Sequence, residues 1–211
     1  MYWFAIFGYL IGSVPFGIIF TRMLNLGDIR AIGSKNIGAT NVLRTGNKTA
    51  AFLTLLFDML KGWAPVWLYM HYSSCNDYGN CSGVFFCQHI STNAVVIALL
   101  SIFGHVFPIF AKFKGGKGVA TTIGTYIALS PFCASVLLGA WGVTLLLSKI
   151  SSLSALISIC IICPIIGAIS IFFGGGLSFF VFTLLCGALI AATHYQNIKR
   201  LIYGTESRIG H

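Results

Sequence analysis

The feature that most constrains this chain is its long runs without Asp, Glu, Lys or Arg. One run covers 49 residues, Ile150 to Ile198, and another covers 31, Gly118 to Ser148. A helix that crosses a bilayer needs about 20 apolar residues. Charged residues make up only 8% of the chain, whereas soluble domains carry about 25%. The sequence therefore predicts an all-α integral membrane protein with several spans, and excludes a soluble enzyme, a disordered tail protein and a bitopic receptor.

The apolar runs predict where the helices lie. The run from Met1 to Thr21 has no basic start and no small-residue cleavage site, so we expect a retained helix interrupted by Gly12, Pro15 and Gly17. Further helices are expected over Thr49–Met70, over Ala94–Phe110, and as two helices within Ile150–Ile198 that turn at Gly174-Gly175-Gly176.

The run from Gly118 to Ser148 is either one long helix or two that turn at Ser130-Pro131. With the turn, twelve of the 13 Lys and Arg residues lie in segments on one side, and Lys61 lies inside a helix. The positive-inside rule favours this arrangement. We therefore predict a single domain, residues 1–211, with seven spans, the N-terminus outside and the C-terminus cytoplasmic. The piece Gly118–Leu129 is short for a span, so it either starts at about Gly115 or enters the bilayer without crossing.

The charge balance and the cysteines narrow the partners. The formal charge of +9 suits anionic lipid headgroups or phosphorylated substrates, and we expect no nucleic acid partner. Cys160 and Cys163 lie in an apolar run without a second ligand pair, so no metal site is predicted. Cys75, Cys81 and Cys87 share a polar loop, where one disulfide and three free thiols are both compatible with the sequence.

The first polar segment on the basic side is GSKNIGATNVLRTGN, Gly33 to Asn47. Its glycines and short polar residues allow the backbone to fold around an anion, and Arg44 can contact a phosphate through two N–H groups. A P-loop is excluded, because Ala39-Thr40 stands where Lys-Ser/Thr is required. A solvated polar loop is the alternative.

The second segment is GHVFPIFAKFKGGKGVAT, Gly104 to Thr121. Gly115, Gly116 and Gly118 surround Lys117 just before an apolar run. Flexible amides and an ammonium at a helix N-terminus attract phosphate. Lys112 and Lys114 are alternatively anchors at the membrane edge.

Two more pairs of polar residues have helical spacing. His194 and Asn197 are three residues apart at a predicted helix end, in a segment that runs on to Glu206 and Arg208. Asp58 and Lys61, also three apart, lie inside a span, where ionisable residues are usually paired. They form either a structural ion pair or, through Lys61, a substrate contact.

Five motifs in this order resemble the acyl-phosphate-dependent glycerol-3-phosphate acyltransferase family (PlsY type) of bacterial inner membranes. They are Gly12-Ser13-x-Pro15, the Gly33–Asn41 loop with Arg44, Asp58-x-x-Lys61-Gly62, the Gly104–Thr121 segment, and His194-x-x-Asn197-Ile198-x-Arg200-Leu201-x-x-Gly204-x-Glu206. Ile37 and Tyr195 depart mildly from the family pattern.

The resemblance implies transfer of a fatty acyl group from acyl phosphate to the 1-hydroxyl of glycerol 3-phosphate. The products would be 1-acylglycerol 3-phosphate (lysophosphatidic acid) and phosphate, in the first step of phospholipid synthesis, without a metal or other cofactor. The sequence agrees, since it contains neither a His followed five residues later by Asp nor a G-x-S-x-G motif. An acyl phosphate carries its own leaving group and mainly requires alignment and charge stabilisation.

The expected roles follow from the resemblance and the residue types. Arg44, Lys117 and the Gly115–Gly118 amides would hold the acyl phosphate. Glycerol 3-phosphate would be held by Ser34, Asn36, Asn41, His194 and Asn197. The general base is either His194 or a phosphate oxygen of the donor. His105 is expected to support the glycine-rich loop. Further residues expected at the substrate site are Lys61, His105, Lys114 and Glu206.

Overall fold

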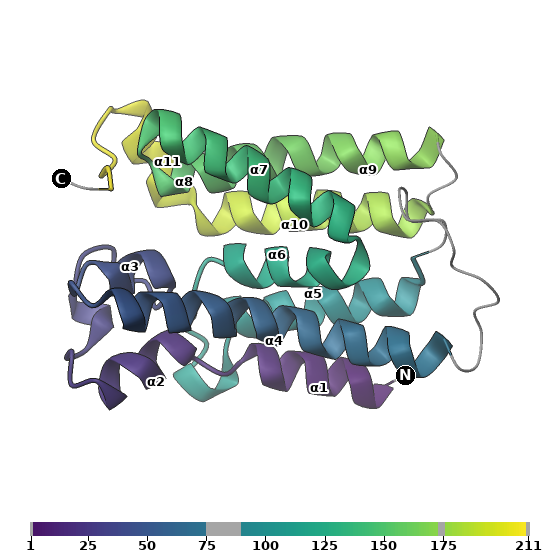
Figure 1. Ribbon diagram of the computed structural model, residues 1–211, viewed down its shortest axis with the longest axis horizontal. Helices are drawn as coiled ribbons and strands as arrows, with labels where there is room; N and C mark the ends of the chain where they lie inside the picture. The colour runs from purple at the N-terminus through teal and green to yellow at the C-terminus, as the bar shows by residue number, and fades with distance from the viewer. Residues whose placement is uncertain (1, 75–89, 173–175, 210–211) are drawn as a thin grey trace. The chain divides into compact units, whose positions relative to one another are not determined.

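The computed structural model describes residues 2–74, 90–172 and 176–209, and every regular element in these ranges is a helix (Figure 1). The chain forms two compact units. Unit 1 contains Met1–Leu68 and Val96–Thr125, and unit 2 contains Tyr69–Val95 and Tyr126–His211. The predicted all-helical fold is confirmed, and the single-domain organisation stays a prediction.

Among the described residues, four helical segments are long and apolar enough to cross a membrane: Lys48–Ser73, Thr92–Ala111, Pro131–Ser148 and Ser151–Phe172. The count becomes six if the bent pairs α1 (Tyr2–Gly12) with α2 (Phe16–Met23), and α10 (Leu177–Thr193) with α11 (Tyr195–Ile202), are each one span. The remaining one of the seven predicted spans corresponds to α6 (Val119–Leu129). Its 11 residues rise only about 16 Å, whereas the hydrocarbon core of a bilayer is about 30 Å thick. Seven crossings and their orientation therefore stay predictions.

Unit 1 is built from α1, α2, α3 (Ala39–Leu43), most of α4 (Lys48–Ser74), most of α5 (Thr92–Val106) and the start of α6. The interruption predicted in the first helix is present: α1 and α2 are separated by a break at Ser13–Pro15 and bent by 41°. Pro15 lacks a backbone N–H and breaks the helical ladder there.

Glycines let the helices of unit 1 approach closely. A Cβ on Gly12 would overlap the Ser101 carbonyl of α5, and one on Gly104 would overlap the Tyr9 carbonyl of α1. Gly62 of α4 meets Thr121 of α6 in the same way. Small residues at such crossings are how membrane helices gain packing contacts.

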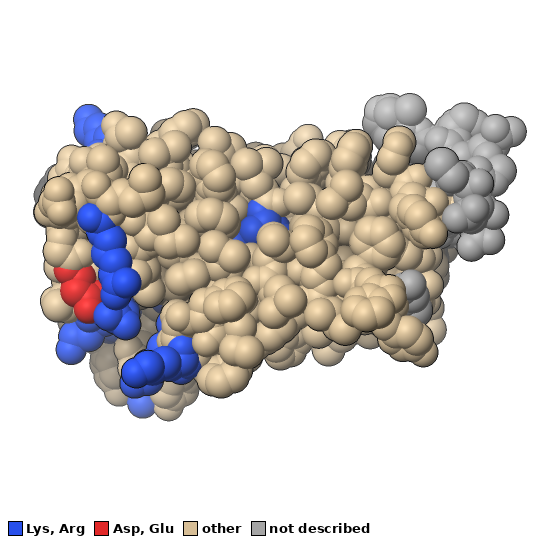
Figure 2. Space-filling model, turned by 90° about the horizontal axis from the view of Figure 1, so that it is seen from below, with Lys and Arg blue, Asp and Glu red and all other residues tan. Residues whose placement is uncertain are grey.

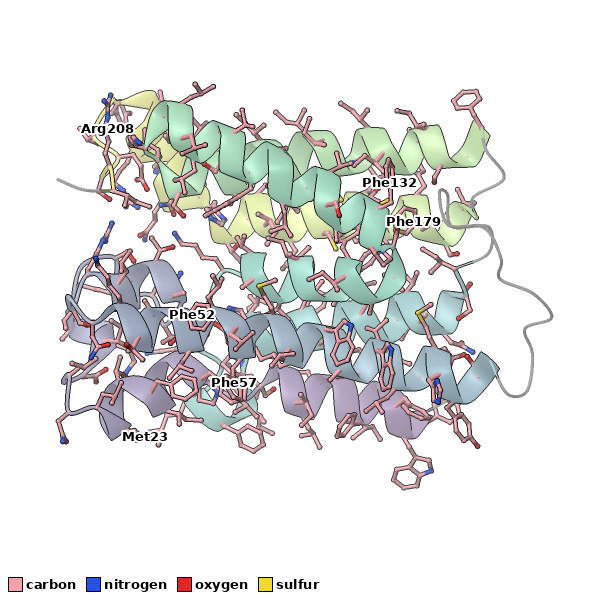
Figure 3. The ribbon with its side chains drawn as sticks, viewed as in Figure 1. Met23, Phe52, Phe57, Phe132, Phe179 and Arg208 are labelled. Carbon is pink, nitrogen blue, oxygen red and sulfur yellow. The ribbon has the colours of Figure 1, made fainter. Side chains whose placement is uncertain are left out.

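Aromatic rings fill the space between α2 and α4. Phe57, labelled in Figure 3, has its ring centroid 5.0 Å from that of Phe16 and 5.3 Å from that of Phe20. This cluster fixes the segment that leads into the first polar loop.

Unit 2 contains α7 (Pro131–Ser148), α8 (Ser151–Ala155), a π-helical stretch η3 (Leu156–Ile162), α9 (Cys163–Phe172), α10 and α11. The Ser130 hydroxyl accepts the Cys133 N–H at 3.3 Å and Pro131 is the first residue of α7, so the predicted turn at Ser130-Pro131 is confirmed. The rings of Tyr126, Phe179 and Phe182 pack together inside this unit, and Figure 3 labels Phe179.

Some predicted boundaries differ from the structure. α4 continues to Ser74, and α5 ends at Val106 and is followed by a 3₁₀ turn, η2 (Ile109–Ala111), because Pro108 cannot continue the helix. Cys75, Cys81 and Cys87, with their open disulfide question, lie outside the described residues. Gly174 and Gly175 of the expected last turn lie outside them too.

Candidate active site

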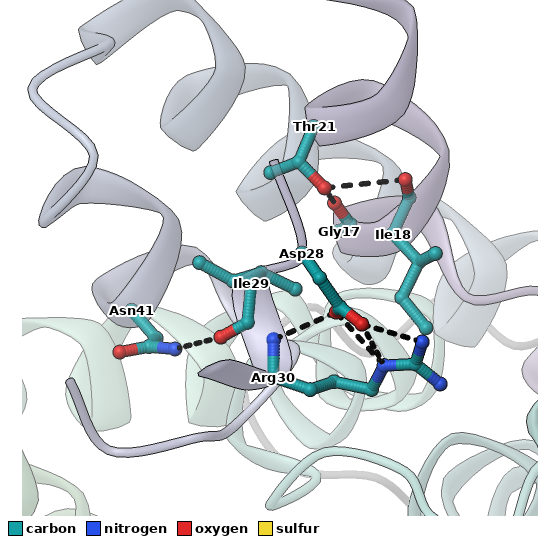
Figure 4. Close-up of polar contacts among 7 residues, drawn as sticks. All are labelled: Gly17, Ile18, Thr21, Asp28, Ile29, Arg30 and Asn41. Atoms are coloured by element: carbon teal, nitrogen blue, oxygen red, sulfur yellow. Dashed lines mark hydrogen bonds and ion pairs between the residues drawn. The ribbon is translucent and has the colours of Figure 1, made fainter. Parts of the chain in front are cut away.

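The first polar loop of unit 1 is folded around the side chain of Asn41. Its amide nitrogen donates to the carbonyls of Ile29, Ile32 and Asn36 at 2.8–3.0 Å, and its amide oxygen accepts the Ser34 N–H at 3.0 Å. Figure 4 shows the contact with Ile29, next to the exposed Asp28–Arg30 ion pair. Asn41 is 2% exposed, so its amide is committed to shaping the loop.

Arg44 and Ser34 border the same turn. Gly33 has a φ of +52°, and a Cβ there would lie 2.6 Å from the Asn41 amide oxygen and 2.9 Å from a guanidinium nitrogen of Arg44. Only glycine leaves room for both side chains in this left-handed conformation. Arg44 and Ser34 are exposed and Asn36 is half-buried. The loop therefore presents a guanidinium and a hydroxyl from a rigid turn.

The glycine-rich segment wraps around the C-terminal end of α5. The Gly116 N–H donates to the His105 carbonyl at 3.0 Å. A Cβ on Gly115 would overlap that carbonyl, and one on Gly116 would overlap the His105 ring. Gly118 has a φ of +88° directly before α6. Lys117, which is half-buried, thus lies two residues before the start of a helix, where its charge and the first amides of α6 can act on one anion.

Asp58 and Lys61 form a buried ion pair inside α4. Lys61 Nζ lies 2.7 Å from Asp58 Oδ1, and the two side chains are 1% and 3% exposed. Lys61 also donates to the Val14 carbonyl at 2.8 Å, at the break between α1 and α2. His105 Nδ1 lies 3.6 Å from Asp58 Oδ1. The structure thus shows the ion pair that the i, i+3 spacing suggests.

In unit 2, the carboxylate of Glu206 connects three segments. Its Oε1 accepts from Asn197 at 2.6 Å and from Ser152 at 2.8 Å, and its Oε2 pairs with Arg200 at 2.6 Å. Burial raises the pKa of the Glu206 carboxyl, but these hydrogen bonds outweigh burial and hold the pKa below its ordinary 4.5. The ionised carboxylate therefore fixes the amide of Asn197.

His194 is the C-cap residue directly after α10, and it is 2% exposed. Its Nδ1 lies 2.9 Å from the Ile190 carbonyl. Because a carbonyl only accepts, the neutral ring carries its proton on Nδ1 and its lone pair on Nε2. This tautomer gives Nε2 the form that a general base requires.

The Lys and Arg side chains are unevenly distributed over the surface. On the face shown in Figure 2, Lys and Arg gather mainly at one end, and most of the remaining face carries no charged residue. This distribution fits a membrane protein whose polar segments meet an aqueous phase at the basic end.

The comparison with known families agrees with these segments. A family model described as glycerol-3-phosphate acyltransferase matches residues 2–204. The chain belongs to the glycerol-3-phosphate acyltransferase family. Among curated relatives, the glycerol-3-phosphate acyltransferases of Brucella canis and Brucella suis biovar 1 are each 43% identical over 206 residues, covering 97% of this chain and 91% of theirs.

Solved structures show the same family and fold. The glycerol 3-phosphate form of PlsY (YgiH), an integral membrane glycerol 3-phosphate acyltransferase, is 32% identical, with a TM-score of 0.83 over 99% of this chain and 94% of that one. Its lysophosphatidic acid form is 30% identical, with a TM-score of 0.79 over the same shares.

Within this acyltransferase, the two units hold different predicted residues. Unit 1 brings Ser34, Asn41 and Arg44 to one turn and Gly115 and Gly116 to His105. Unit 2 brings Asn197 to Glu206. Lys114 is exposed in the loop before Gly115. The substrate contacts predicted for all these residues stay predictions, and in the part of the chain that the structure describes no three His, Cys, Asp or Glu side chains are grouped to hold a metal.

Sequence reasoning missed two contacts. Ser152 lies 54 residues before Glu206, and the Val14 carbonyl lies 47 residues before Lys61. The serine has no distinguishing sequence pattern. For the carbonyl the sequence offered a partial signal, because Pro15 predicts a helix break that leaves backbone carbonyls without helical partners.

Proposed function

We propose that this protein transfers a fatty acyl group from acyl phosphate to the 1-hydroxyl of glycerol 3-phosphate, releasing lysophosphatidic acid and inorganic phosphate. The observation that carries this proposal is the match to PlsY over nearly the whole chain, because that protein was solved with both glycerol 3-phosphate and lysophosphatidic acid. These molecules are the acceptor and the product of the proposed reaction. The reaction would be the first step of phospholipid synthesis. The chain would form a single transmembrane domain in a bacterial inner membrane, with its active site on the cytoplasmic side.

The choice of donor rests on chemistry. The hydroxyl oxygen attacks the acyl carbon, the bond from that carbon to the phosphate oxygen breaks, and phosphate leaves with the electron pair. No enzyme nucleophile is required, and the sequence offers none of the usual motifs for one. The protein must instead align the two substrates and stabilise negative charge. Alignment alone can lower the activation barrier by about 7–11 kcal/mol.

Unit 1 supplies candidates for the phosphate contacts. Arg44 is exposed on a turn that Asn41 holds rigid, and Lys117 follows two glycines that are packed against His105. We assign the acyl phosphate to Arg44, Lys117 and the amides of Gly115, Gly116 and Gly118. Ser34 and Asn36 are assigned to glycerol 3-phosphate. For Asn41 the geometry favours a positioning role, since its amide already makes four hydrogen bonds.

Unit 2 supplies the candidate base. With its lone pair on Nε2, His194 can take the hydroxyl proton of glycerol 3-phosphate. Asn197, held by Glu206, is assigned to the same substrate. The departing phosphate is the rival proton acceptor.

The test is phosphate release by purified protein given glycerol 3-phosphate and palmitoyl phosphate. Turnover with palmitoyl phosphate and none above background with palmitoyl-CoA or palmitoyl acyl carrier protein would support the proposal. Robust turnover with palmitoyl-CoA would contradict the donor assignment.

Variants separate the roles. Lys117→Ala and Arg44→Ala should lower turnover at least about tenfold and raise the apparent KM for acyl phosphate. His194→Ala should lower kcat and remove the acid limb of the pH–rate profile. If that limb survives, the proton goes to the substrate phosphate.

A further inference from the structure

A polar cluster is buried inside unit 1, away from the exposed loop residues. It consists of Asp58 and Lys61 on α4 and His105 near the end of α5, whose side chains are 3%, 1% and 4% exposed. Charged groups in membrane-spanning helices are costly unless they are paired. The cluster therefore calls for a physical reason beyond ordinary packing.

The contacts of Lys61 explain why its charged side chain can be buried. It pairs with Asp58, donates to the Val14 carbonyl and lies 5.6 Å from the centroid of the Phe16 ring. These contacts connect α4 to the backbone at the break between α1 and α2. They do not explain why a histidine lies on the other side of the carboxylate.

His105 lies between the carboxylate and the glycine-rich segment. The ring nitrogen Nδ1 lies 3.6 Å from Asp58 Oδ1. Asp58 Oδ1 is already paired with Lys61, and Nδ1 has no hydrogen bond of regular geometry among the described residues, so the Asp58 carboxylate is the polar group that Nδ1 faces. The other ring atoms, Nε2 first, lie where a Cβ on Gly116 would be.

The backbone of His105 acts on the same glycines. Its carbonyl accepts the Gly116 N–H at 3.0 Å and also lies where a Cβ of Gly115 would be. Ring and carbonyl together determine the path of the chain one residue before Lys117. A change in the ring's orientation must therefore move the glycines or open a gap beside them.

We infer that Asp58 is a positioning residue, which orients the ring of His105 so that the ring and its backbone hold Gly115, Gly116 and hence Lys117 in place. The inference rests on the proposed function only in giving Lys117 a phosphate contact. The order of action is carboxylate, imidazole, glycine pair, lysine. Asp58 itself touches no substrate.

The first experiment replaces the buried pair with apolar residues of similar size. The double variant Asp58→Leu/Lys61→Met leaves no buried charge unpaired, which single substitutions would do. We expect faster amide hydrogen exchange in the peptide that contains residues 111–118. The KM that rises in Lys117→Ala should also rise here, by about tenfold, because small displacements of a binding group cost rate steeply. A folded double variant with wild-type exchange and wild-type KM values would overturn the inference.

The second experiment uses size compensation and does not disturb the ion pair. Gly116→Ala places a methyl group where the His105 ring lies, so it should lower kcat/KM and speed exchange. Adding His105→Ala makes room for that methyl group and should recover much of both effects. Additive losses in His105→Ala/Gly116→Ala would show that the ring does not hold the glycine.

The third arm tests the order of action. In a His105→Ala background, Asp58→Leu/Lys61→Met should raise the same KM no further, since its effect passes through the missing ring. A further rise of similar size would contradict the inference.

The matched control is Asp28→Asn, which removes the exposed Asp28–Arg30 ion pair of the same unit. It should leave exchange in residues 111–118 unchanged. If the wild-type protein does not turn over palmitoyl phosphate, the proposed function fails, whereas the exchange measurements still decide whether Asp58 and His105 hold the glycine-rich segment.

Discussion

At the residue scale, single buried polar side chains organise the loops of this protein. Asn41 satisfies three carbonyls and one N–H in the first loop, and Glu206 joins Ser152, Asn197 and Arg200 in the tail. Both side chains are almost inaccessible, at 2% and 6% exposure. Buried polar groups that are fully satisfied specify one conformation, whereas removing one partner leaves the others unsatisfied.

Glu206 should make stability depend on pH. Its pKa is lower in the folded chain than its ordinary 4.5, so the unfolded chain binds the proton first as pH falls. The stabilisation is complete above about pH 4.5 and is lost as pH falls through the folded-state value. Thermal unfolding midpoints in detergent, measured from neutral pH down to about pH 3, should fall less steeply for Glu206→Gln than for the wild type.

The control for that series is Asp28→Asn. Hydrogen bonds from Arg30 lower the pKa of the Asp28 carboxyl to about 2, so its effect should appear at lower pH than that of Glu206. Parallel pH curves for Glu206→Gln and the wild type would contradict the role assigned to the carboxylate.

At the element scale, helix packing in unit 1 depends on glycines at crossings, whereas Gly139 of α7 has room for a side chain. Gly12 and Gly104 each face a backbone carbonyl of the neighbouring helix, but nothing lies within 4 Å of a Cβ built on Gly139 of α7. The same residue type therefore has opposite consequences in different helices.

Gly12→Ala and Gly104→Ala should each lower the free energy of unfolding by about 1–3 kcal/mol, because α1 and α5 must separate to admit the methyl group. Gly139→Ala, the matched control, should be neutral or add about 0.5–1 kcal/mol through helix propensity. Thermal unfolding midpoints in detergent provide the measurement. Equal stability of Gly12→Ala and Gly139→Ala would show that the α1–α5 contact is not tight.

At the scale of the whole molecule, the number of membrane crossings depends on whether the short helix α6 spans the bilayer. In the part of the chain that the structure describes, four to six segments are long and apolar enough to span a membrane, and α6 has only 11 residues. The basic residues predict an odd number of crossings, with the N-terminus outside and the tail inside.

Labelling with a thiol reagent that cannot cross membranes should decide the topology. In intact cells, a variant that keeps Cys81 as its sole cysteine should react from outside. A cysteine-free variant with one cysteine added after Arg208 should react only after the cells are permeabilised. Labelling of the added cysteine in intact cells would contradict the predicted orientation.

The sequence by itself determined the class of protein, because membrane insertion depends on local properties such as runs of apolar residues and the placement of charge. It also predicted the interruption near Pro15 and suggested the Asp58–Lys61 pair, both of which depend on residues that are neighbours along the chain. The turn at Ser130-Pro131 was chosen from the distribution of Lys and Arg over the loops.

Only the tertiary structure decided which polar side chains form hydrogen bonds within the protein. Asn41 was predicted to bind substrate, yet its amide is engaged within the loop, and Glu206 is engaged with Ser152, which lies 54 residues away. His105 was expected to support the glycine-rich loop, but its place between Asp58 and Gly116 follows from the packing of α4, α5 and the segment after α5. A motif specifies residue types and spacing. Which donor meets which acceptor depends on distances between elements, and those distances are set by how the helices pack.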